Sequence, residues 1–293
     1  MGIRPYRVTK PTHFGVVAPW CVGLMALSPD AARLDGRVAV VTGGGSGIGR
    51  GIAEGFAAYG AKVAIWERNA DTAAAVADSI GGLACVTDVR DPSAVDDALG
   101  RTTAELGAPS ILVNNAGGVF PSPLLDTEPK GWDVLIRSNL GHVLLCTQRV
   151  GRAMVAAGSG GSVINVTSIE GARAAPLYAA YSAAKAGVIN LTQTAALELA
   201  PHRIRVNALA PDLTATEGLE AMTGTAGIER GARMIPMGRA GHVDEMAGAA
   251  VFLASDLSSY VTGQVLHVDG GTHAAGGWYP DPADGHYVLG PQG

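Results

Sequence analysis

The chain has 293 residues, of which 47% are hydrophobic and 16% charged, and its net charge is −5. This length and apolar content suffice for one large folded domain, and the lack of a basic run argues against binding to nucleic acid. Its three cysteines form no Cys-x-x-Cys pair, so we expect a reducing, cytoplasmic environment and no disulfide framework. The histidines form no metal-binding motif, and we expect no metal site.

Residues 1–33 are expected to form an N-terminal extension outside the core. An apolar stretch over residues 14–27 follows several basic residues, in the manner of a signal peptide. Pro19 interrupts this stretch, which is too short to span a membrane. We therefore expect neither a targeting signal nor contact with a membrane, and Met25 begins a sequence that would serve as an ordinary start.

Strands and helices alternate along the rest of the chain. Short apolar runs predict strands over residues 38–41, 63–66, 83–87, 111–114, 162–167, 204–209 and 264–268. Helices are predicted over residues 48–59, 71–80, 93–106 (with Ser93 as N-cap), 132–157 and 176–199. This alternation predicts an α/β fold, a doubly wound Rossmann-type parallel sheet of about seven strands with helices on both faces. Ligands of such sheets bind at the carboxyl ends of the strands.

A glycine-rich turn joins the first predicted strand to the first predicted helix. The turn runs from Thr42 to Gly49, with the sequence Thr-Gly-Gly-Gly-Ser-Gly-Ile-Gly. Glycine allows backbone angles that are closed to other residues and lets a pyrophosphate approach the main chain. Free N–H groups and the dipole at the helix start attract the phosphate charge. This turn is therefore typical of a nucleotide-binding site, whereas a glycine motif outside such a context would be a plain flexible turn.

Tyr181 and Lys185 stand four residues apart in a predicted helix and share one of its faces. A nearby ammonium favours the phenolate, so we expect Lys185 to lower the pKa of Tyr181 and to make it an acid/base near neutral pH. Ser168 ends a predicted strand and can hydrogen-bond the same substrate oxygen. Such a trio suits hydride chemistry on a carbonyl group, although Tyr-x-x-x-Lys alone is also common on ordinary helix faces.

With Asp88, the Asn-Asn-Ala-Gly run that ends at Gly117, and Asn139, these motifs occur in the order of the short-chain dehydrogenase/reductase family. The chain resembles that family over about residues 34–271, which we expect to be a single catalytic domain. The resemblance implies a catalytic tetrad of Asn139, Ser168, Tyr181 and Lys185. It also implies cofactor contacts from Gly43, Ser46, Gly47, Ile48, Gly49, Glu67, Arg68, Asp88, Val89, Asn115, Ala116, Gly117, Tyr181, Lys185, Pro211, Leu213 and Thr216.

The resemblance implies an NAD(P)-dependent oxidoreductase that interconverts a small-molecule secondary alcohol and a ketone. Tyr181 would be the acid/base, Lys185 would also bind the nicotinamide ribose, and Asn139 would hold a water that links Lys185 to solvent. Glu67 lies 24 residues after Gly43, near the position of a ribose-binding acid, so we expect NAD. Arg68 leaves NADP open, because an arginine there can hold a 2′-phosphate.

Two features depart from the family pattern or vary within it. The family usually has Pro-Gly after the sixth strand, whereas this chain has Pro211-Asp212. The Asp212 carboxylate would bind a polar substrate or point to solvent. Residues 217–236, with Met222 and Met234 inside the range and Met237 directly after it, are expected to be the variable substrate loop.

The resemblance also implies a homotetramer. The C-terminal tail, residues 272–293, is rich in glycine and proline and carries Trp278, Tyr279 and Tyr287, so we expect it at a subunit interface. Two other functions remain open: a nucleotide-binding regulatory or structural subunit without catalysis, and a dehydratase or epimerase that uses the same cofactor. The intact tetrad favours the dehydrogenase over the first of them.

Overall fold

The computed structural model describes residues 27–281 and 284–289, so the expectations about residues 1–26 lie outside it. Seven parallel strands form one sheet in the order β3-β2-β1-β4-β5-β6-β7. The strands are β1 Val38–Thr42, β2 Lys62–Glu67, β3 Leu83–Val86, β4 Ile111–Asn114, β5 Gly161–Val166, β6 Ile204–Pro211 and β7 Val265–Val268. This arrangement confirms the predicted Rossmann-type sheet.

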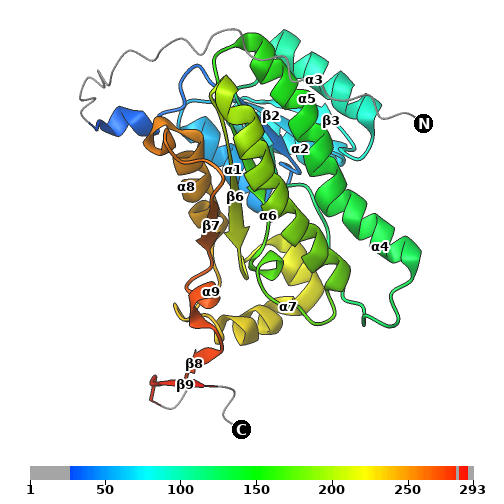
Figure 1. Cartoon of the computed structure of the whole chain (residues 1–293), viewed down its shortest axis with the longest axis vertical. Helices are drawn as coiled ribbons and strands as arrows, with labels where there is room; N and C mark the ends of the chain where they lie inside the picture. Colours follow the sequence, from blue (N-terminus) through cyan, green and yellow to red (C-terminus); the bar gives the residue numbers. More distant parts are fainter. Residues whose placement is uncertain (1–26, 282–283, 290–293) are drawn as a thin grey trace.

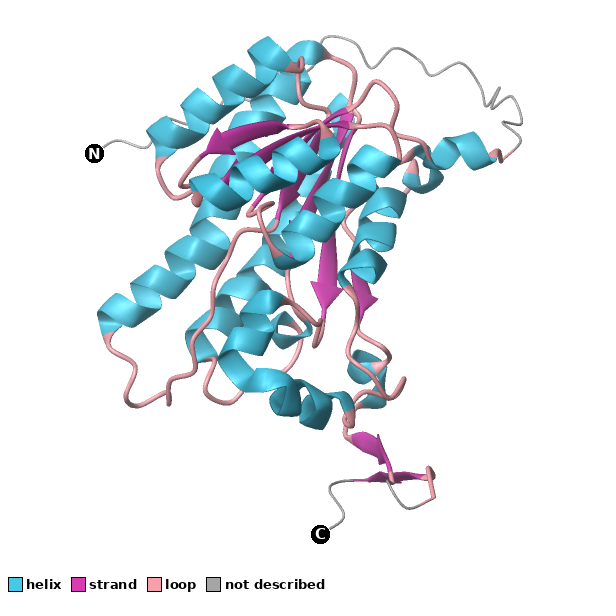
Figure 2. Ribbon diagram, turned by 180° about the vertical axis from the view of Figure 1, so that it is seen from behind, coloured by secondary structure: helices cyan, strands magenta, loops and turns pink. Residues whose placement is uncertain are grey.

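Helices cover both faces of the sheet (Figures 1 and 2). They are α1 Gly47–Ala58, α2 Ala70–Ile80, α3 Pro92–Glu105, α4 Pro129–Ile136, α5 His142–Ala157, α6 Ala179–Leu199, α7 Glu217–Ala232, α8 Val243–Ala254 and α9 Thr272–Ala275. Helices α1, α2 and α8 contribute to the core on one face, and α3, α5 and α6 contribute to the core on the other. Because both faces are covered, the strands are apolar almost throughout, as the short apolar runs of the sequence indicated.

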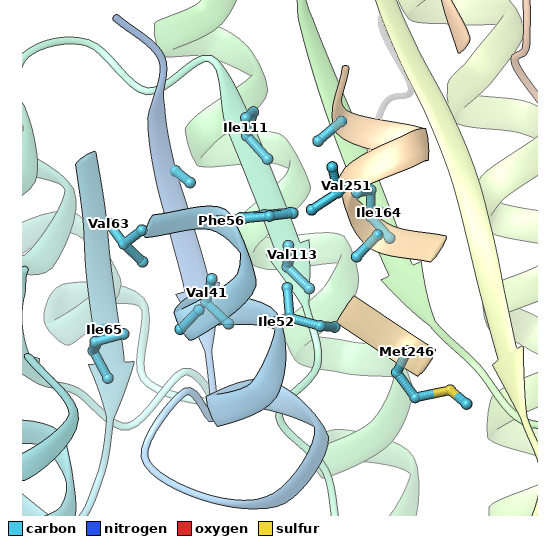
Figure 3. Packing of buried hydrophobic residues seen from close by; sticks show 14 of the residues in the cluster. Val41, Ile52, Phe56, Val63, Ile65, Ile111, Val113, Ile164, Met246 and Val251 are labelled. Atoms are coloured by element: carbon cyan, nitrogen blue, oxygen red, sulfur yellow. The ribbon is translucent and has the colours of Figure 1, made fainter. Parts of the chain in front are cut away.

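Figure 3 shows the core between the sheet and the α1–α8 layer. Phe56 and Ile52 of α1 are fully buried in one hydrophobic cluster with Val41 of β1. Met246 and Val251 of α8 belong to the same cluster. Burial of a side chain of this size stabilises the fold by about 1.5–3 kcal/mol. This layer holds the start of α1 firmly at the end of β1, where the glycine turn lies.

The sheet order reverses direction at β1, which pairs with β2 on one side and with β4 on the other. The connections after these strands therefore leave on opposite faces and open a crevice at their carboxyl ends. Thr42 joins the two sides of the crevice. Its hydroxyl donates to the Val113 carbonyl oxygen at 3.2 Å and accepts from the backbone N–H of Asn115 at 2.9 Å.

Several helix boundaries differ from the sequence prediction. Helix α3 begins at Pro92 with Asp91 as its N-cap, so Ser93 is not the cap, because the Asp91 carboxylate accepts from the Ser93 N–H. The expected helix over residues 132–157 is two helices joined by a π-helical segment at Arg137–Gly141. Residues 217–236, expected to be a loop, contain α7, which is kinked at Gly224.

Helix α8 was not predicted, because beyond the two acids of its first turn its sequence is a continuous run of apolar and small residues. A local signal was nevertheless present at its start. His242 accepts from the Asp244 N–H, and Glu245 accepts from the His242 N–H, which together form a capping box.

The N-terminal end of the described chain packs against the body of the protein, whereas the C-terminal end projects from it. Pro29–Ala32 form a short 3₁₀ turn against Asp256–Ser258, and Leu34 is fully buried. Beyond α9, strands β8 (Trp278–Pro280) and β9 (Tyr287–Leu289) form an antiparallel hairpin. The hairpin projects from the end of the molecule that carries α7 and α9 (Figure 1).

Candidate active site

Two cavities lie along the carboxyl ends of the central strands. The first, of about 420 Å³, extends over the ends of β1, β2 and β3, and the second, of about 260 Å³, lies over the ends of β5 and β6. Asn115, Gly117 and Gly118 line both cavities, so the two form one continuous crevice at the point where the strand order reverses.

The glycine turn forms the floor of this crevice at the start of α1. Gly43 has a φ of +63°, and a Cβ there would lie only 2.9 Å from the Cα of Ala116. The exposed Ser46 hydroxyl makes no capping hydrogen bond, whereas the Gly47 N–H at the start of α1 interacts with the Glu217 carboxylate. A pyrophosphate fits such a turn, since the backbone is bare and the helix dipole favours its charge.

Gly49 of the glycine turn lies outside both cavities. A Cβ at this position would lie 2.1 Å from the Gly43 carbonyl oxygen and 2.4 Å from Asn115 Nδ2. Gly49 is buried, and neither Gly49 nor Gly47 is among the residues that line the two cavities. Gly49 therefore lets α1 approach the end of β4, and its contribution to a cofactor site is indirect.

Acidic and basic side chains alternate at the far end of the larger cavity. Glu67 at the end of β2 accepts hydrogen bonds from the backbone N–H groups of Arg68 and Asn69, at 2.8 and 3.0 Å. Asp88 and Arg90 form a bidentate ion pair, which lowers the pKa of Asp88 to about 2. Arg68 lines the same cavity, and its charge also lowers the pKa of Asp88.

The Asn-Asn-Ala-Gly run joins this region to the smaller cavity. Asn115 Nδ2 donates to the carbonyl oxygens of Thr42 and Gly43, both at 3.1 Å, and so holds the glycine turn against β4. Asn114 is buried and donates to Thr147 and Asn165, which ties the end of β4 to α5 and β5. The run is therefore fixed by hydrogen bonds on both sides of the crevice.

Ser168, Tyr181 and Lys185 line the smaller cavity together. Lys185 is 5% exposed, and its Nζ donates to the Val166 carbonyl oxygen at 2.8 Å and lies 5.6 Å from the centroid of the Tyr181 ring. Burial lowers the pKa of Lys185 to about 8. Ser168 stands two residues after Val166, the last residue of β5, and is largely buried in the wall of the cavity.

The pKa of Tyr181 differs from the sequence expectation. Burial raises the pKa of Tyr181, a hydrogen bond with Ser168 lowers it, and the charge of Glu170 raises it. Lys185 is not among these causes, because its ammonium lies over the ring rather than beside the phenol oxygen. Ser168 is therefore the side chain that favours the phenolate in this form of the protein.

Asn139 reaches the cavity from the π-helical segment between α4 and α5. Its Nδ2 donates to the carbonyl oxygens of Gly118 and Leu135, at 2.8 and 2.9 Å, and its Oδ1 accepts from the Gly118 N–H at 3.3 Å. Interruptions of this kind in an α-helix are frequent at functional sites. Here the interruption braces Gly117 and Gly118, which line both cavities.

Most residues expected at the site are brought together by the fold. Those that line the crevice are Gly43, Ser46, Ile48, Glu67, Arg68, Asp88, Val89, Asn115, Ala116, Gly117, Asn139, Ser168, Tyr181, Lys185, Pro211, Leu213 and Thr216. The sequence analysis missed further lining residues, namely Trp66, Thr87, Arg90, Gly118, Val119, Val134, Ser138, Val166, Thr167, Thr214 and Leu219. Of these, Arg90 was detectable, because it follows Asp88 at a spacing that permits a local ion pair.

The fold and the crevice define a dinucleotide-dependent oxidoreductase. A family model described as enoyl-(acyl carrier protein) reductase matches residues 42–273. The sorbitol dehydrogenase of Cereibacter sphaeroides is 38% identical over 251 residues, which are 82% of this chain and 98% of that enzyme.

Two solved structures are similar in both sequence and shape. A short-chain type dehydrogenase/reductase from Mycobacterium marinum has a TM-score of 0.79 and 37% identity, covering 83% of this chain and 98% of that one. A gluconate 5-dehydrogenase from Burkholderia cenocepacia, in complex with NADP and tartrate, has a TM-score of 0.78 and 41% identity, covering 84% and 98%.

The chain belongs to the short-chain dehydrogenase/reductase family. It is an NAD(P)-dependent oxidoreductase that acts on CH–OH groups and interconverts a secondary alcohol and a ketone. None of the helices over residues 27–281 is long and apolar enough to cross a membrane.

Proposed function

We propose that Tyr181, Ser168 and Lys185 carry out this reaction, with Asn139 as the residue that positions the adjoining backbone. One observation carries the proposal: all four side chains line a cavity of about 260 Å³ that is continuous with the larger cavity over the glycine turn. A dinucleotide laid along the crevice would bring its nicotinamide end to Tyr181 and its adenosine end to Asp88.

In the oxidative direction, Tyr181 takes the proton of the substrate hydroxyl, and in the reductive direction it returns that proton to the carbonyl oxygen. Ser168 holds the same oxygen and stabilises the phenolate through its hydrogen bond with Tyr181. When bound, the nicotinamide supplies the acceptor or donor of the hydride. Lys185 provides positive charge under the phenol ring and donors for the ribose hydroxyls.

We propose NAD as the preferred cofactor. Glu67 is held at the end of β2 by two backbone N–H groups, and its carboxylate lines the adenosine end of the crevice. A carboxylate there accepts hydrogen bonds from ribose hydroxyls and repels a 2′-phosphate. Arg68 and Arg90 lie in the same cavity, but the bidentate pairing of Arg90 with Asp88 leaves Arg68 as the candidate cation for NADP.

We also propose one catalytic domain over residues 34–271, a homotetramer, and a place for the C-terminal tail at a subunit contact. The hairpin of the tail supports the last point, since Trp278 and Tyr287 on it are about half exposed. The two described cysteines, Cys85 and Cys146, are free and buried, which supports a cytoplasmic location.

A panel of alcohols and ketones, assayed with NAD, NADP and their reduced forms by absorbance of the reduced cofactor, tests the assigned roles. We expect turnover of at least one secondary alcohol or ketone that Tyr181→Phe abolishes. Equal turnover by the wild type and Tyr181→Phe would disprove the assignment of the acid/base.

A further inference from the structure

Asp212 places a carboxylate in the catalytic cavity. It follows Pro211, the last residue of β6, and lines the smaller cavity together with Ser168 and Tyr181. The family usually has a glycine at this position, so the carboxylate is a feature of this chain. Because β6 ends at the same edge of the sheet as β5, Asp212 lines the same cavity as the reactive side chains.

The backbone around Asp212 is held in place. The Thr214 hydroxyl donates to the Asp212 carbonyl oxygen at 3.1 Å, and Thr214 is 5% exposed. Gly241 extends this support, since it donates to the Leu213 carbonyl oxygen and accepts from the Ala215 N–H, both at 2.9 Å. The carboxylate is therefore carried by a backbone segment that several hydrogen bonds hold in place.

The charge of Asp212 is uncompensated within the described part of the chain, where no cation forms an ion pair with it. Lys185 is the other charged residue that lines this cavity, but its ammonium is buried and bonded to the Val166 carbonyl oxygen. Asp212 is partly exposed and faces the cavity. An incoming substrate thus meets a carboxylate before it meets the ammonium.

Glu170, another acid near Tyr181, differs from Asp212 because it has a cationic partner. Its carboxylate pairs with Arg173 at 3.2 Å, and Glu170 is not among the residues that line the cavity. Asp212 is therefore the acid in this region whose full charge is available to a ligand. A carboxylate only accepts hydrogen bonds, and vicinal hydroxyl groups can donate two of them to it, whereas a carboxylate on the substrate would be repelled.

We propose that Asp212 selects uncharged polyhydroxylated substrates and rejects sugar acids. This inference rests on the proposed function, because it assigns the substrate class of the same cavity. Relatives of this chain include both kinds of enzyme, a sorbitol dehydrogenase and a gluconate 5-dehydrogenase whose structure contains tartrate. The charge of Asp212 favours the neutral polyol over the sugar acid.

The test compares D-sorbitol with D-gluconate as substrates of the full-length enzyme. Asp212→Asn keeps the size of the side chain and removes its charge, and Asp212→Gly restores the usual residue of the family. We expect both variants to raise the ratio of kcat/KM for gluconate to that for sorbitol by roughly tenfold or more, mainly through KM. Asp97→Asn, an exposed position on α3, changes the net charge equally and should leave the ratio unchanged.

A second measurement does not depend on the identity of the natural alcohol. Binding of tartrate to the enzyme saturated with NAD is measured by calorimetry, alongside the affinity for NAD itself. We expect tartrate to bind Asp212→Asn at least tenfold more tightly than the wild type, with the affinity for NAD unchanged.

Equal tartrate affinity in the wild type and in Asp212→Asn would overturn the selection by charge, whatever the enzyme oxidises. Failure of the proposed function has a separate signature, which is the absence of any turnover sensitive to Tyr181→Phe across the alcohol and ketone panel. The two failures are therefore distinguishable.

Discussion

The ammonium of Lys185 lies over the ring of Tyr181, 5.6 Å from the ring centroid. The carbonyl oxygen of Val166 at the end of β5 holds the ammonium there, at 2.8 Å. Burial lowers the pKa of Lys185 to about 8 and raises the pKa of Tyr181. Ser168 supplies the hydrogen bond that favours the phenolate, and the charge of Lys185 is not among the causes of the Tyr181 pKa.

Tyr181→Phe should lower kcat by a factor of about 10²–10⁴, the usual contribution of a general acid/base. The dissociation constant for NAD, measured by fluorescence titration, should stay within about twofold, because the glycine turn and the adenosine end do not involve the phenol. Retention of most of the activity would disprove the role of Tyr181.

Lys185→Ala should impair both kcat and NAD affinity. The lysine is assigned to the ribose hydroxyls as well as to the phenolate, so its removal affects two steps. Parallel titrations and steady-state kinetics distinguish this variant from Tyr181→Phe. A loss of kcat without any loss of NAD affinity would contradict the contact with the ribose.

The sheet and the glycine turn were predictable because their signals are local. Val38–Thr42 is an apolar run followed directly by glycines and a helix start, and the order of such units defines the parallel sheet. Helix α8 was not predictable by periodicity, because a helix buried on most sides has no polar face. The π-helical segment at Arg137–Gly141 interrupts a stretch that the sequence predicts as one continuous helix, and only the folded chain shows it.

Individual contacts at the site were less predictable than its composition. Gly49 belongs to the expected motif. A side chain is excluded there because the Gly43 carbonyl oxygen approaches closely, and only the folded turn reveals this contact. The pKa of Tyr181 was expected to fall because Lys185 shares its helix face. Spacing along a helix places two side chains near each other but does not tell which atom of the ring the ammonium approaches.

NAD should bind more tightly than NADP, and Arg68→Ala should widen the difference. Glu67 repels a 2′-phosphate, whereas Arg68 attracts it, so removal of Arg68 should weaken NADP binding roughly tenfold and leave NAD almost unchanged. Calorimetric titration of both cofactors checks this. Tighter binding of NADP than of NAD by the wild type would refute the preference.

The stability of the enzyme should fall with acid because of His142, whose side chain is 1% exposed. Burial, aided by the charge of Lys185, lowers the pKa of His142 to about 3. The unfolded chain takes up this proton near pH 6.5, so between about pH 6 and 4 the free energy of unfolding should lose up to about 1.4 kcal/mol per pH unit. Urea unfolding at several pH values should show a shallower slope for His142→Asn.

His202→Asn provides the control for this experiment, because His202 is exposed. Its removal should leave the slope unchanged. In the folded protein, the pKa values of the Asp88 and Glu245 carboxylates are lowered to about 2. In the unfolded chain, the same carboxylates bind protons near pH ~4. Identical slopes for the wild type and His142→Asn between pH 6 and 4 would contradict the assignment.

A chain that starts at Met25 should fold and turn over like the full-length protein. It retains every described residue, including the turn at Pro29–Ala32 and the buried Leu34. We expect the melting temperature and kcat to match those of the full chain within experimental error. Loss of soluble protein on this truncation would show that the first residues pack on the body or on a partner.

The hairpin of the C-terminal tail should depend on a neighbouring subunit. Its two strands have three residues each, and an isolated two-stranded hairpin is marginally stable in water. Trp278 is 49% and Tyr287 is 52% exposed in the single chain, and aromatic side chains of this kind are enriched at interfaces. The hairpin therefore has more to gain from contact with a second copy than from its own pairing.

Deletion of residues 276–293 should weaken the tetramer and reduce kcat/KM, whereas deletion of residues 290–293 alone should change neither. Light scattering at micromolar concentration measures the assembly, and kinetics at the same concentration measure the effect on the site. A wild-type mass of 29.7 kDa would refute the tetramer. If the longer deletion changed neither the assembly nor the kinetics, the role given to the hairpin would be refuted but the tetramer would not. The subunits would then associate through the body of the protein.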